Sequence, residues 1–243
     1  MDTQKVKAGA VISAALEIYG SQVWVLIPAA VVVFAIVAVA SLVFSGGAAA
    51  LVSLFAIVLT TFYQGMVVEL VADVQDGRRD SSVGQLFRGV APIVLPLIGL
   101  SLVVGIGILV GLVLLIVPGL ILWTMWAVAA PSLVIERKGA LAAMRRSREL
   151  VRGHGWQVFG VILVVLALAL IAGILVAALA SGLGNGGVAV VQWAANVIFA
   201  PFTALVIAVL YFTLRRLHGE GEPAAPAATQ PPASPPPSMD IGL

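Results

Sequence analysis

The chain has 243 residues, of which 61% are hydrophobic and only 10% are charged. A soluble domain of this length needs far more charge to cover its surface, so the composition excludes an ordinary soluble enzyme or binding domain. The formal net charge is +2, and the absence of cysteine excludes disulfides, thiolate metal sites and cysteine nucleophiles.

The chain opens with a short polar segment that has a helical pattern, residues 5–19. Its apolar residues recur at intervals of three and four, which predicts an amphipathic helix lying in the membrane interface. These residues are Val11, Ile12, Ala15, Leu16 and Tyr19. A signal peptide is the alternative for this end of the chain, because Ala38-Val39-Ala40 resembles a cleavage site. The long polar stretch before the apolar run, and the continuation of that run past Ala40, favour an uncleaved span.

Six hydrophobic segments follow, and most of them have the length of a bilayer-spanning helix. They cover approximately residues 22–44, 48–71, 91–117, 120–135, 156–179 and 188–214. The sequence therefore predicts an all-α integral membrane protein with six transmembrane helices in a domain of residues 1–218. Residues 219–243 are rich in Pro and Ala and predict a disordered tail, with a Pro-rich ligand for a partner domain as the alternative.

Three local signals predict details of the connections. Residues 81–88 predict a short helix capped by Ser81 or Ser82. Pro118-Gly119 predicts a tight turn between the third and fourth spans. Pro131 lies within the fourth span and predicts a kink there, because proline cannot donate the helical hydrogen bond.

All thirteen Lys and Arg residues fall on one side of the predicted membrane. They precede the first span, lie between the second and third and between the fourth and fifth, and follow the sixth, whereas the three opposite loops carry no charge. The positive-inside rule therefore predicts that both termini are cytoplasmic and that the protein lies in the cell (inner) membrane. Since the basic residues flank hydrophobic segments, they indicate topology and not nucleic-acid binding.

The same alternation predicts an internal repeat. A polar segment with a helical pattern precedes each outward span, at residues 11–19, 82–88 and 140–152. The sequence thus favours three pseudo-repeated units, each an interfacial helix on the cytoplasmic side followed by a transmembrane hairpin.

The most basic stretch follows the fourth span. At 100° per residue, a helix over residues 140–152 has one arc of small or apolar residues and one charged arc. The charged arc consists of Arg145, Arg146, Arg148, Glu149 and Arg152. The four arginines predict binding to the phosphates of anionic lipids, with Glu149 paired to Arg145 and Arg152. A plain topology anchor and a protein-docking site are the alternatives.

Polar residues at membrane depth are uncharged, which does not fit a proton-driven transporter. Hydrogen bonds between helices are the preferred explanation for them. Gln192 and Asn196 lie four residues apart on one helical face, so the lining of a polar cavity is the functional alternative. Small residues at helical spacing, such as Gly107 and Gly111 or those around Gly173, predict close packing of helices.

No motif for an enzyme is present. His154 and His218 are the only histidines, and no cluster of carboxylates accompanies them in the sequence. There is no P-loop, nucleophile elbow or zincin motif. The sequence therefore predicts a protein without catalytic activity, metal site or cofactor, and two histidines that are simply solvated.

Residues 118–159 carry a resemblance to a known family. They contain a Pro-Gly pair, a span with Pro131 that is followed by Glu136, an Ala-rich helix with Arg146-Ser147, and the entry Gly155-Trp156 to the next span. This pattern resembles the membrane domain associated with bacterial glycerophosphoryl diester phosphodiesterases and with related uncharacterised multi-pass proteins. In that family the activity belongs to a separate soluble barrel. The motifs of that barrel are absent here, so the resemblance implies a membrane domain and no catalytic residue. The Ala, Val and Arg usage is typical of a high-GC bacterium.

These patterns lead to two hypotheses. The first is a non-enzymatic membrane protein that organises or senses lipid or scaffolds a partner, with anionic membrane lipids as ligands and a protein partner or second copy as a further option. The second is a transporter or channel for a neutral or lipidic solute, lined by Gln192 and Asn196.

Overall fold

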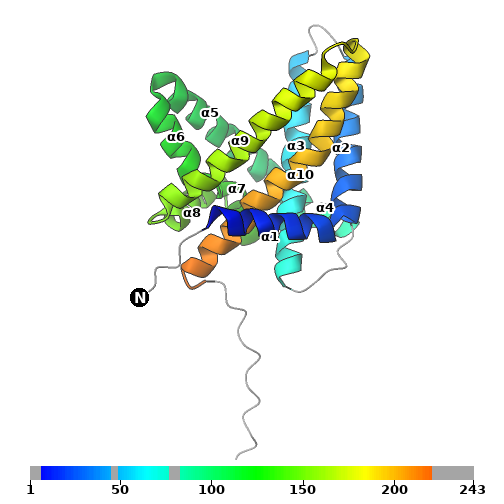
Figure 1. The fold of residues 1–243 in the computed structure, drawn as a ribbon. Coiled ribbons are helices and arrows are strands. Elements are labelled where there is room, and N and C mark those ends of the chain that lie inside the picture. The colour runs from blue at the N-terminus through cyan, green and yellow to red at the C-terminus, as the bar shows by residue number, and fades with distance from the viewer. Residues whose placement is uncertain (1–6, 45–48, 77–82, 221–243) are drawn as a thin grey trace, which may run out of the picture.

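The computed structural model describes residues 7–44, 49–76 and 83–220, and these residues form helices and no strands (Figure 1). Six stretches in this part are long and apolar enough to cross a membrane: Val23–Ser41, Leu51–Gln75, Val83–Leu114, Ile116–Glu136, Gly155–Ala180 and Gly186–Leu217. The prediction of an all-α membrane protein with six spans is confirmed. The serines predicted to cap the helix over residues 81–88, and the predicted tail from residue 221 onward, lie outside the described residues.

The order of the helices repeats three times, with one short helix before each antiparallel pair. The first unit contains α1 (Ala8–Ser21), α2 (Val23–Val43) and α3 (Ala49–Gln75). The second contains α4 (Val83–Val90), the 3₁₀ turn η2 (Ala91–Ile93), α5 (Val94–Leu114), α6 (Ile116–Met125) and α7 (Ala129–Glu136). The third contains α8 (Ala140–Val151), α9 (Gly155–Ala180) and α10 (Asn185–Leu217). This order agrees with the predicted three-unit organisation.

Helix α1 lies across the ends of the long helices and not along them (Figure 1). Its buried residues are Val11, Ala15 and Ile18, spaced four and three apart, and the helix packs mainly against α10 and α9. The predicted amphipathic helix is therefore present, but its buried arc differs from the predicted one. Ile18 is buried, whereas Leu16, which was expected on the buried arc, is 53% exposed.

The predicted turn at Pro118-Gly119 is wrong, because the chain reverses at Leu115, where the backbone is extended between α5 and α6. Pro118 is the third residue of α6. In the first turn of a helix the backbone N–H groups have no partner within the helix, so the N–H that proline lacks is not needed there. Gly119 faces α5 so closely that an added Cβ would lie 2.6 Å from atoms of Leu112, and Gly111 faces Gly119 in turn. Gly111 thus allows the close packing that was predicted for it. The same prediction is wrong at Gly173, which is exposed and where an added Cβ would meet no atom within 4 Å.

The fourth span is broken into two helices. Residues 126–128 form turns between α6 and α7, and Pro131 is the third residue of α7. A continuous helix would bring the ring of Pro131 against the carbonyl of residue 127. The predicted distortion is therefore present as a break four residues before the proline, and not as a bend at it.

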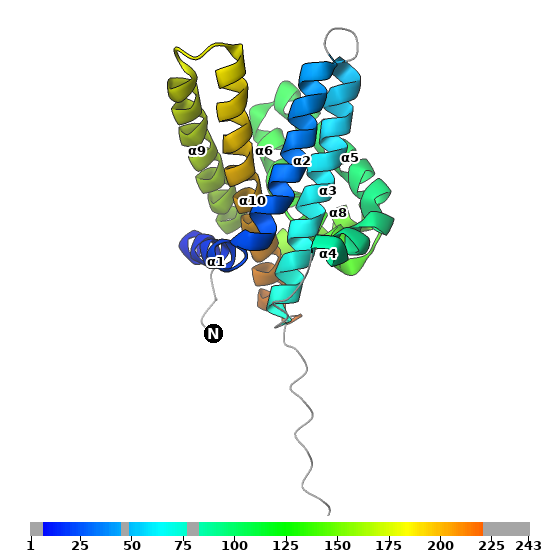
Figure 2. The same cartoon turned by 90° about the vertical axis from the view of Figure 1, so that its right-hand side faces the viewer.

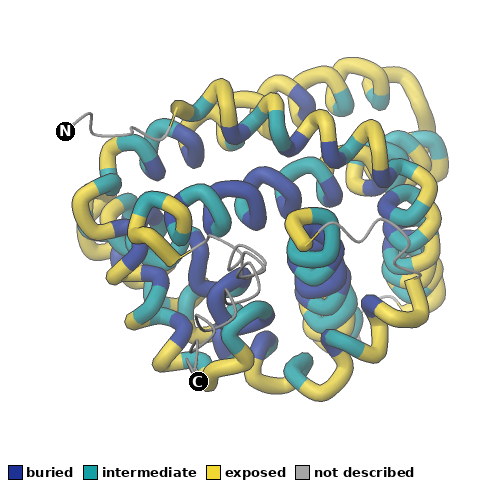
Figure 3. The backbone as a smooth tube through the Cα atoms, turned by 90° about the horizontal axis from the view of Figure 1, so that it is seen from below, coloured by how far each residue is buried: buried dark blue, intermediate teal, exposed yellow. Residues whose placement is uncertain are grey.

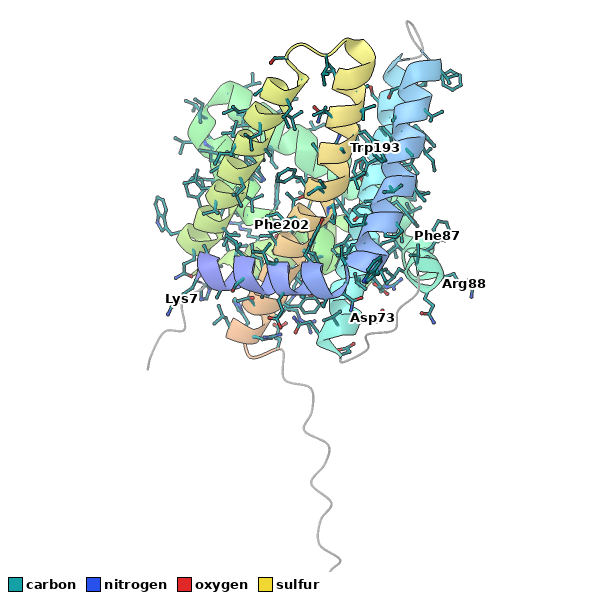
Figure 4. All side chains as sticks on the ribbon, turned by 45° about the vertical axis from the view of Figure 1, so that its right-hand side comes forward. Lys7, Asp73, Phe87, Arg88, Trp193 and Phe202 are labelled. Atoms are coloured by element: carbon teal, nitrogen blue, oxygen red, sulfur yellow. The ribbon has the colours of Figure 1, made fainter. Side chains whose placement is uncertain are left out.

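We call the end of the bundle at which α1, α4 and α8 lie the basic end, because the described Lys and Arg residues gather there. Figure 4 shows Lys7, Asp73 and Arg88 at this end, and Trp193 far from it, along α10. The described basic residues are Lys7, Arg88, Arg137, Lys138, Arg145, Arg146, Arg148, Arg152, Arg215 and Arg216.

Packing is tightest near the basic end. The last turns of α10 are buried nearly all round, with Leu205, Leu210, Tyr211 and Leu214 at 0% exposure, and this helix contacts α1, α2, α3, α7, α8 and α9. Seen from that end, the buried positions lie on the inner sides of the helices and the exposed positions on the rim (Figure 3). Away from that end the hairpins α2–α3, α5–α6 and α9–α10 diverge (Figures 1 and 2).

Candidate functional site

Helix α8 closes the broken fourth span with its buried face. The Ser147 hydroxyl, on a fully buried side chain, donates a hydrogen bond of 2.8 Å to the Met125 carbonyl and accepts one of 3.3 Å from the Val128 amide. These two backbone groups flank the break between α6 and α7, where helical partners are missing. Ser147 therefore satisfies both sides of the break and fixes α8 beneath it.

Arg146 extends this attachment through charge. Its guanidinium donates to Glu136 Oε1 at 2.8 Å and also contacts Glu220, while Glu149 lies 3.8 Å away. Glu136 in addition accepts hydrogen bonds from Lys138 at 2.6 Å and from the Tyr211 hydroxyl at 3.1 Å. The Arg146 side chain is only 18% exposed, so this ion-pair cluster joins α7, α8 and the end of α10 in a partly buried setting.

The pairing predicted for Glu149 is wrong. Among the described residues Glu149 contacts Arg146 and neither Arg145 nor Arg152. The structural reason is that Arg146 reaches inward from the edge of the buried face, where Glu136 and Glu220 also lie, so three carboxylates share one guanidinium.

A second link stands at the end of α7. Arg137 donates to Glu69 Oε1 at 2.9 Å and to the Gly89 carbonyl at 2.6 Å, and so ties α7 to α3 and α4. Arg137 itself has a left-handed backbone, with φ of 52°, which ends α7 as a C-terminal cap. Glu69, in α3, and Glu136, the last residue of α7, are thus both engaged with arginines.

The exposed face of α8 borders a groove of about 980 Å³ between α6 and α9. One wall is a single face of α6, formed by Val117, Leu120, Ile121 and Thr124. These positions follow the spacing of three and four that places residues on one side of a helix, and they span about 10 Å along the axis. Trp156 and Phe159 of α9 form part of the other wall.

The floor of the groove is polar and basic. Arg148 and Arg152 line it with exposed side chains, and the turn between α8 and α9 adds His154. His154 is also the residue that precedes α9, whose N-terminus has no side-chain cap. The free N–H groups at the start of α9 and the positive end of its helix dipole therefore add to the positive potential of the two arginines.

Two residues that line the groove each carry a buried polar atom without a partner. His154 Nδ1 and Gln157 Oε1 are buried and form no hydrogen bond within the described protein. Trp156, the neighbour of Gln157 in the chain, is 87% exposed at the start of α9, a position typical of a tryptophan at the membrane interface. The groove thus combines an apolar wall and a cationic floor.

The four predicted headgroup arginines are divided by the structure. Arg148 and Arg152 meet at the groove. Arg145 is exposed but does not line it, and Arg146 is engaged in the ion-pair cluster. His154 and His218 lie with their rings 5.9 Å apart at the basic end, and only His154 borders the groove.

Gln192 and Asn196 lie far from this groove, in the less packed half of α10, and both are exposed. Neither amide forms a hydrogen bond with another described residue, so the interhelical bonds preferred for them are not seen there. The neighbouring Trp193 Nε1 is buried without a partner as well. Figure 4 shows Trp193 and Phe202 on opposite sides of α10.

Sequence reasoning missed the role of Ser147 and the wall of the groove. The apolar face of α6 is indistinguishable in sequence from any lipid-facing helix, so no signal marked it. Ser147 did carry a signal, because it is a polar residue at the centre of the predicted apolar arc of α8. A metal site is not indicated among the described residues, which contain no group of three or more His, Asp or Glu side chains suited to one.

Comparison with known proteins adds nothing to this geometry. No protein-family model, curated protein sequence or solved structure matches the chain.

Proposed function

We propose that this protein is a non-enzymatic membrane protein that binds an anionic lipid in the groove between α6 and α9. The observation that carries the proposal is the groove itself, which has an apolar wall along α6 and places Arg148, Arg152 and the uncapped N-terminus of α9 at one end. An acyl chain fits the wall, and a phosphate fits the cationic floor.

The location of the groove agrees with this function. It opens beside Trp156 at the start of a span, the level at which lipid headgroups meet helices. A single exposed arginine on a membrane helix attracts any anionic surface, whereas two arginines beside an apolar wall select a lipid that offers both a phosphate and a chain.

The test is native mass spectrometry of the full chain with phosphatidylglycerol. The variant Arg148→Gln/Arg152→Gln should lose most of the bound lipid. The matched variant Arg88→Gln/Arg145→Gln removes the same charge from exposed positions outside the groove and should keep it. Equal loss in both variants would show that binding follows net charge and not the groove.

We further propose that the basic end faces the cytoplasm of a bacterial cell and that the protein acts by organising or sensing lipid there. The positive-inside rule supports this orientation. Because the chain has no native cysteine, single cysteines are clean probes. A cysteine at Gly184, in the turn between α9 and α10, should react with an impermeant maleimide on intact cells, and one at Gly219 should not. The reverse pattern would overturn the orientation.

Transport of a neutral or lipidic solute is the second candidate. The observation that favours it is the pair Gln192 and Asn196, whose side chains are exposed and form no hydrogen bond with the described residues. They lie in a helix long and apolar enough to span a membrane, where an amide without hydrogen bonds is destabilising. Solute or lipid flux in proteoliposomes should then fall in Gln192→Leu/Asn196→Leu. Flux that is absent, or unchanged in this variant, would remove the candidate. The family resemblance noted above remains a prediction.

A further inference from the structure

The two arginines on the floor of the groove form a like-charge pair that no acidic residue of the groove neutralises. We infer that the lipid bound there carries two phosphates joined by a short polar linker, which is the headgroup of the cardiolipin class, and that each arginine meets one phosphate. This inference rests on the proposed lipid-binding function and specifies its ligand.

The first step is the charge of the floor. Arg148 and Arg152 are exposed, and neither forms an ion pair with another described residue. None of the described residues that line the groove is acidic. The start of α9, which has no side-chain cap, adds a partial positive charge of about one half. A lipid with one phosphodiester therefore leaves at least one positive charge without a counterion, whereas a lipid with two neutralises both arginines.

The second step concerns the spacing of the two arginines. Arg148 lies in the last turn of α8, and Arg152, four residues later, is the residue that ends it. Side chains at this spacing start about 6 Å apart on one helix face, where like charges repel. A guanidinium binds a phosphate through two parallel hydrogen bonds, which occupy both free oxygens of a phosphodiester. A second phosphate on a short linker gives the second arginine the same pairing and removes the repulsion.

The third step concerns the apolar sides of the groove. The face of α6 forms one wall, and Trp156 and Phe159 of α9, with rings 6.1 Å apart, form part of the other. Trp156 is 87% exposed, so this second wall is uncovered as well. A lipid with two phosphates has acyl chains on both sides of its linker and covers both walls. A soluble bisphosphate would leave both uncovered, so the walls commit the site to a lipid.

The experiment is native mass spectrometry of the full chain in detergent with cardiolipin, phosphatidylglycerol and phosphatidate that carry the same acyl chains. Cardiolipin should bind at least about tenfold more tightly than phosphatidylglycerol, which is the contribution of one further hydrogen bond to a charged group. Phosphatidate carries close to two negative charges on a single phosphate at neutral pH. It should bind like phosphatidylglycerol. Equal binding of phosphatidate and cardiolipin would mean that charge alone selects the lipid, and would overturn the inference.

Single-arginine variants separate the second phosphate from the additional acyl chains of cardiolipin. Arg148→Gln and Arg152→Gln should each remove most of the preference for cardiolipin over phosphatidylglycerol, because each leaves one phosphate without its arginine. The matched variant Arg145→Gln removes the same charge outside the groove and should keep the preference. A preference that is unchanged in both groove variants would come from the acyl chains and would contradict the inference.

The remaining outcomes separate this inference from the proposed function. Inorganic pyrophosphate at the same concentration should not displace cardiolipin, and displacement would overturn the commitment to a lipid. If the wild type binds cardiolipin and phosphatidylglycerol equally, and Arg148→Gln/Arg152→Gln loses both, the lipid site stands and the two-phosphate inference is overturned. If no anionic lipid binds, the proposed function falls as well. The ranking of the lipids by the wild type decides the matter even where a variant does not fold.

Discussion

The two faces of α8 use the same residue type in different ways. On the inner side, Arg146 is 18% exposed and meets carboxylates of α7, of α8 and of Glu220, which follows α10. On the outer side, Arg148 and Arg152 are exposed and border a groove with no acidic residue among its described lining. An arginine surrounded by carboxylates holds a fold together, and an arginine without them is available to a ligand. The difference arises from position around the helix, since Arg146 and Arg148 are only two residues apart.

The largest expected effect on stability follows from removing Arg146. In Arg146→Met, Glu136 and Glu220 lose their shared partner in a partly buried setting, and the free energy of unfolding should fall by about 2–3 kcal/mol. Lipid binding should be unchanged, because Arg146 does not line the groove. Thermal unfolding in detergent measures the first, and native mass spectrometry measures the second.

The double variant Glu136→Gln/Arg146→Met serves as the control for Arg146→Met. It removes the acid together with the base. It should recover part of the lost stability, because residue 136 then carries no partly buried charge that has lost its arginine partner. A single variant as stable as the wild type would contradict the structural role of the inner face.

A smaller loss of stability should follow from Ser147→Ala. The substitution leaves the Met125 carbonyl and the Val128 amide without their side-chain partner, which should cost about 1–2 kcal/mol. The control is Ser13→Ala, at an exposed serine of α1 that bonds only its own helix. Equal unfolding temperatures for the two variants would mean that the break between α6 and α7 is closed without Ser147.

The outer face can be tested by filling the groove without changing any charge. An added Cβ at Gly155, which lines the groove, meets no atom within 4 Å, and the same holds for Gly160, which does not line it. Gly155→Leu should therefore weaken lipid binding several-fold, on the order of 1 kcal/mol for a displaced apolar contact, and Gly160→Leu should not. Both variants should fold, because leucine favours a helix over glycine. Equal lipid binding by the two variants would place the lipid elsewhere.

The smallest effect is expected for Arg145→Gln. Arg145 is exposed, does not line the groove, and has no ion pair with another described residue. Its replacement should change the free energy of unfolding by less than about 0.5 kcal/mol, as for most surface substitutions. Lipid affinity should be unchanged too. A marked loss of lipid binding in this variant would mean that the whole basic surface, and not the groove, holds the lipid.

The membrane spans show which features of the fold the hydropathy of the sequence predicts. Predicted and observed spans agree to within a few residues at most ends, because the length and apolar character of a crossing helix are local properties. The prediction was wrong at Pro118, and at Pro131 it gave a kink where the span is in fact broken at residues 126–128. Proline removes one donor, but it is equally at home in the first turn of a helix, and the sequence does not say whether a neighbour such as Ser147 satisfies a break.

The candidate site was predicted in part. Periodicity indicated a basic arc on α8 containing Arg148 and Arg152, since the angle between residues on a helix is fixed. It did not separate Arg146 from them, because two of the carboxylates that engage Arg146, Glu136 and Glu220, lie outside α8 and are brought to it only by the packing of the helices. It did not reveal Gln157 or the wall at Val117 and Ile121 either.

The sequence by itself determined that this chain is an integral membrane protein, that it has six spans, and that its basic residues lie at one end of the bundle. Those features depend on whether each segment is apolar enough for the bilayer or polar enough for water, and on the local spacing of such residues. Only the tertiary structure decided which arginine is paired within the protein, which serine closes a broken span, and where α6 and α9 leave a groove. These features depend on how helices distant in sequence pack, and no local pattern encodes the distance between Ser147 and Met125 or the space beside Gly155.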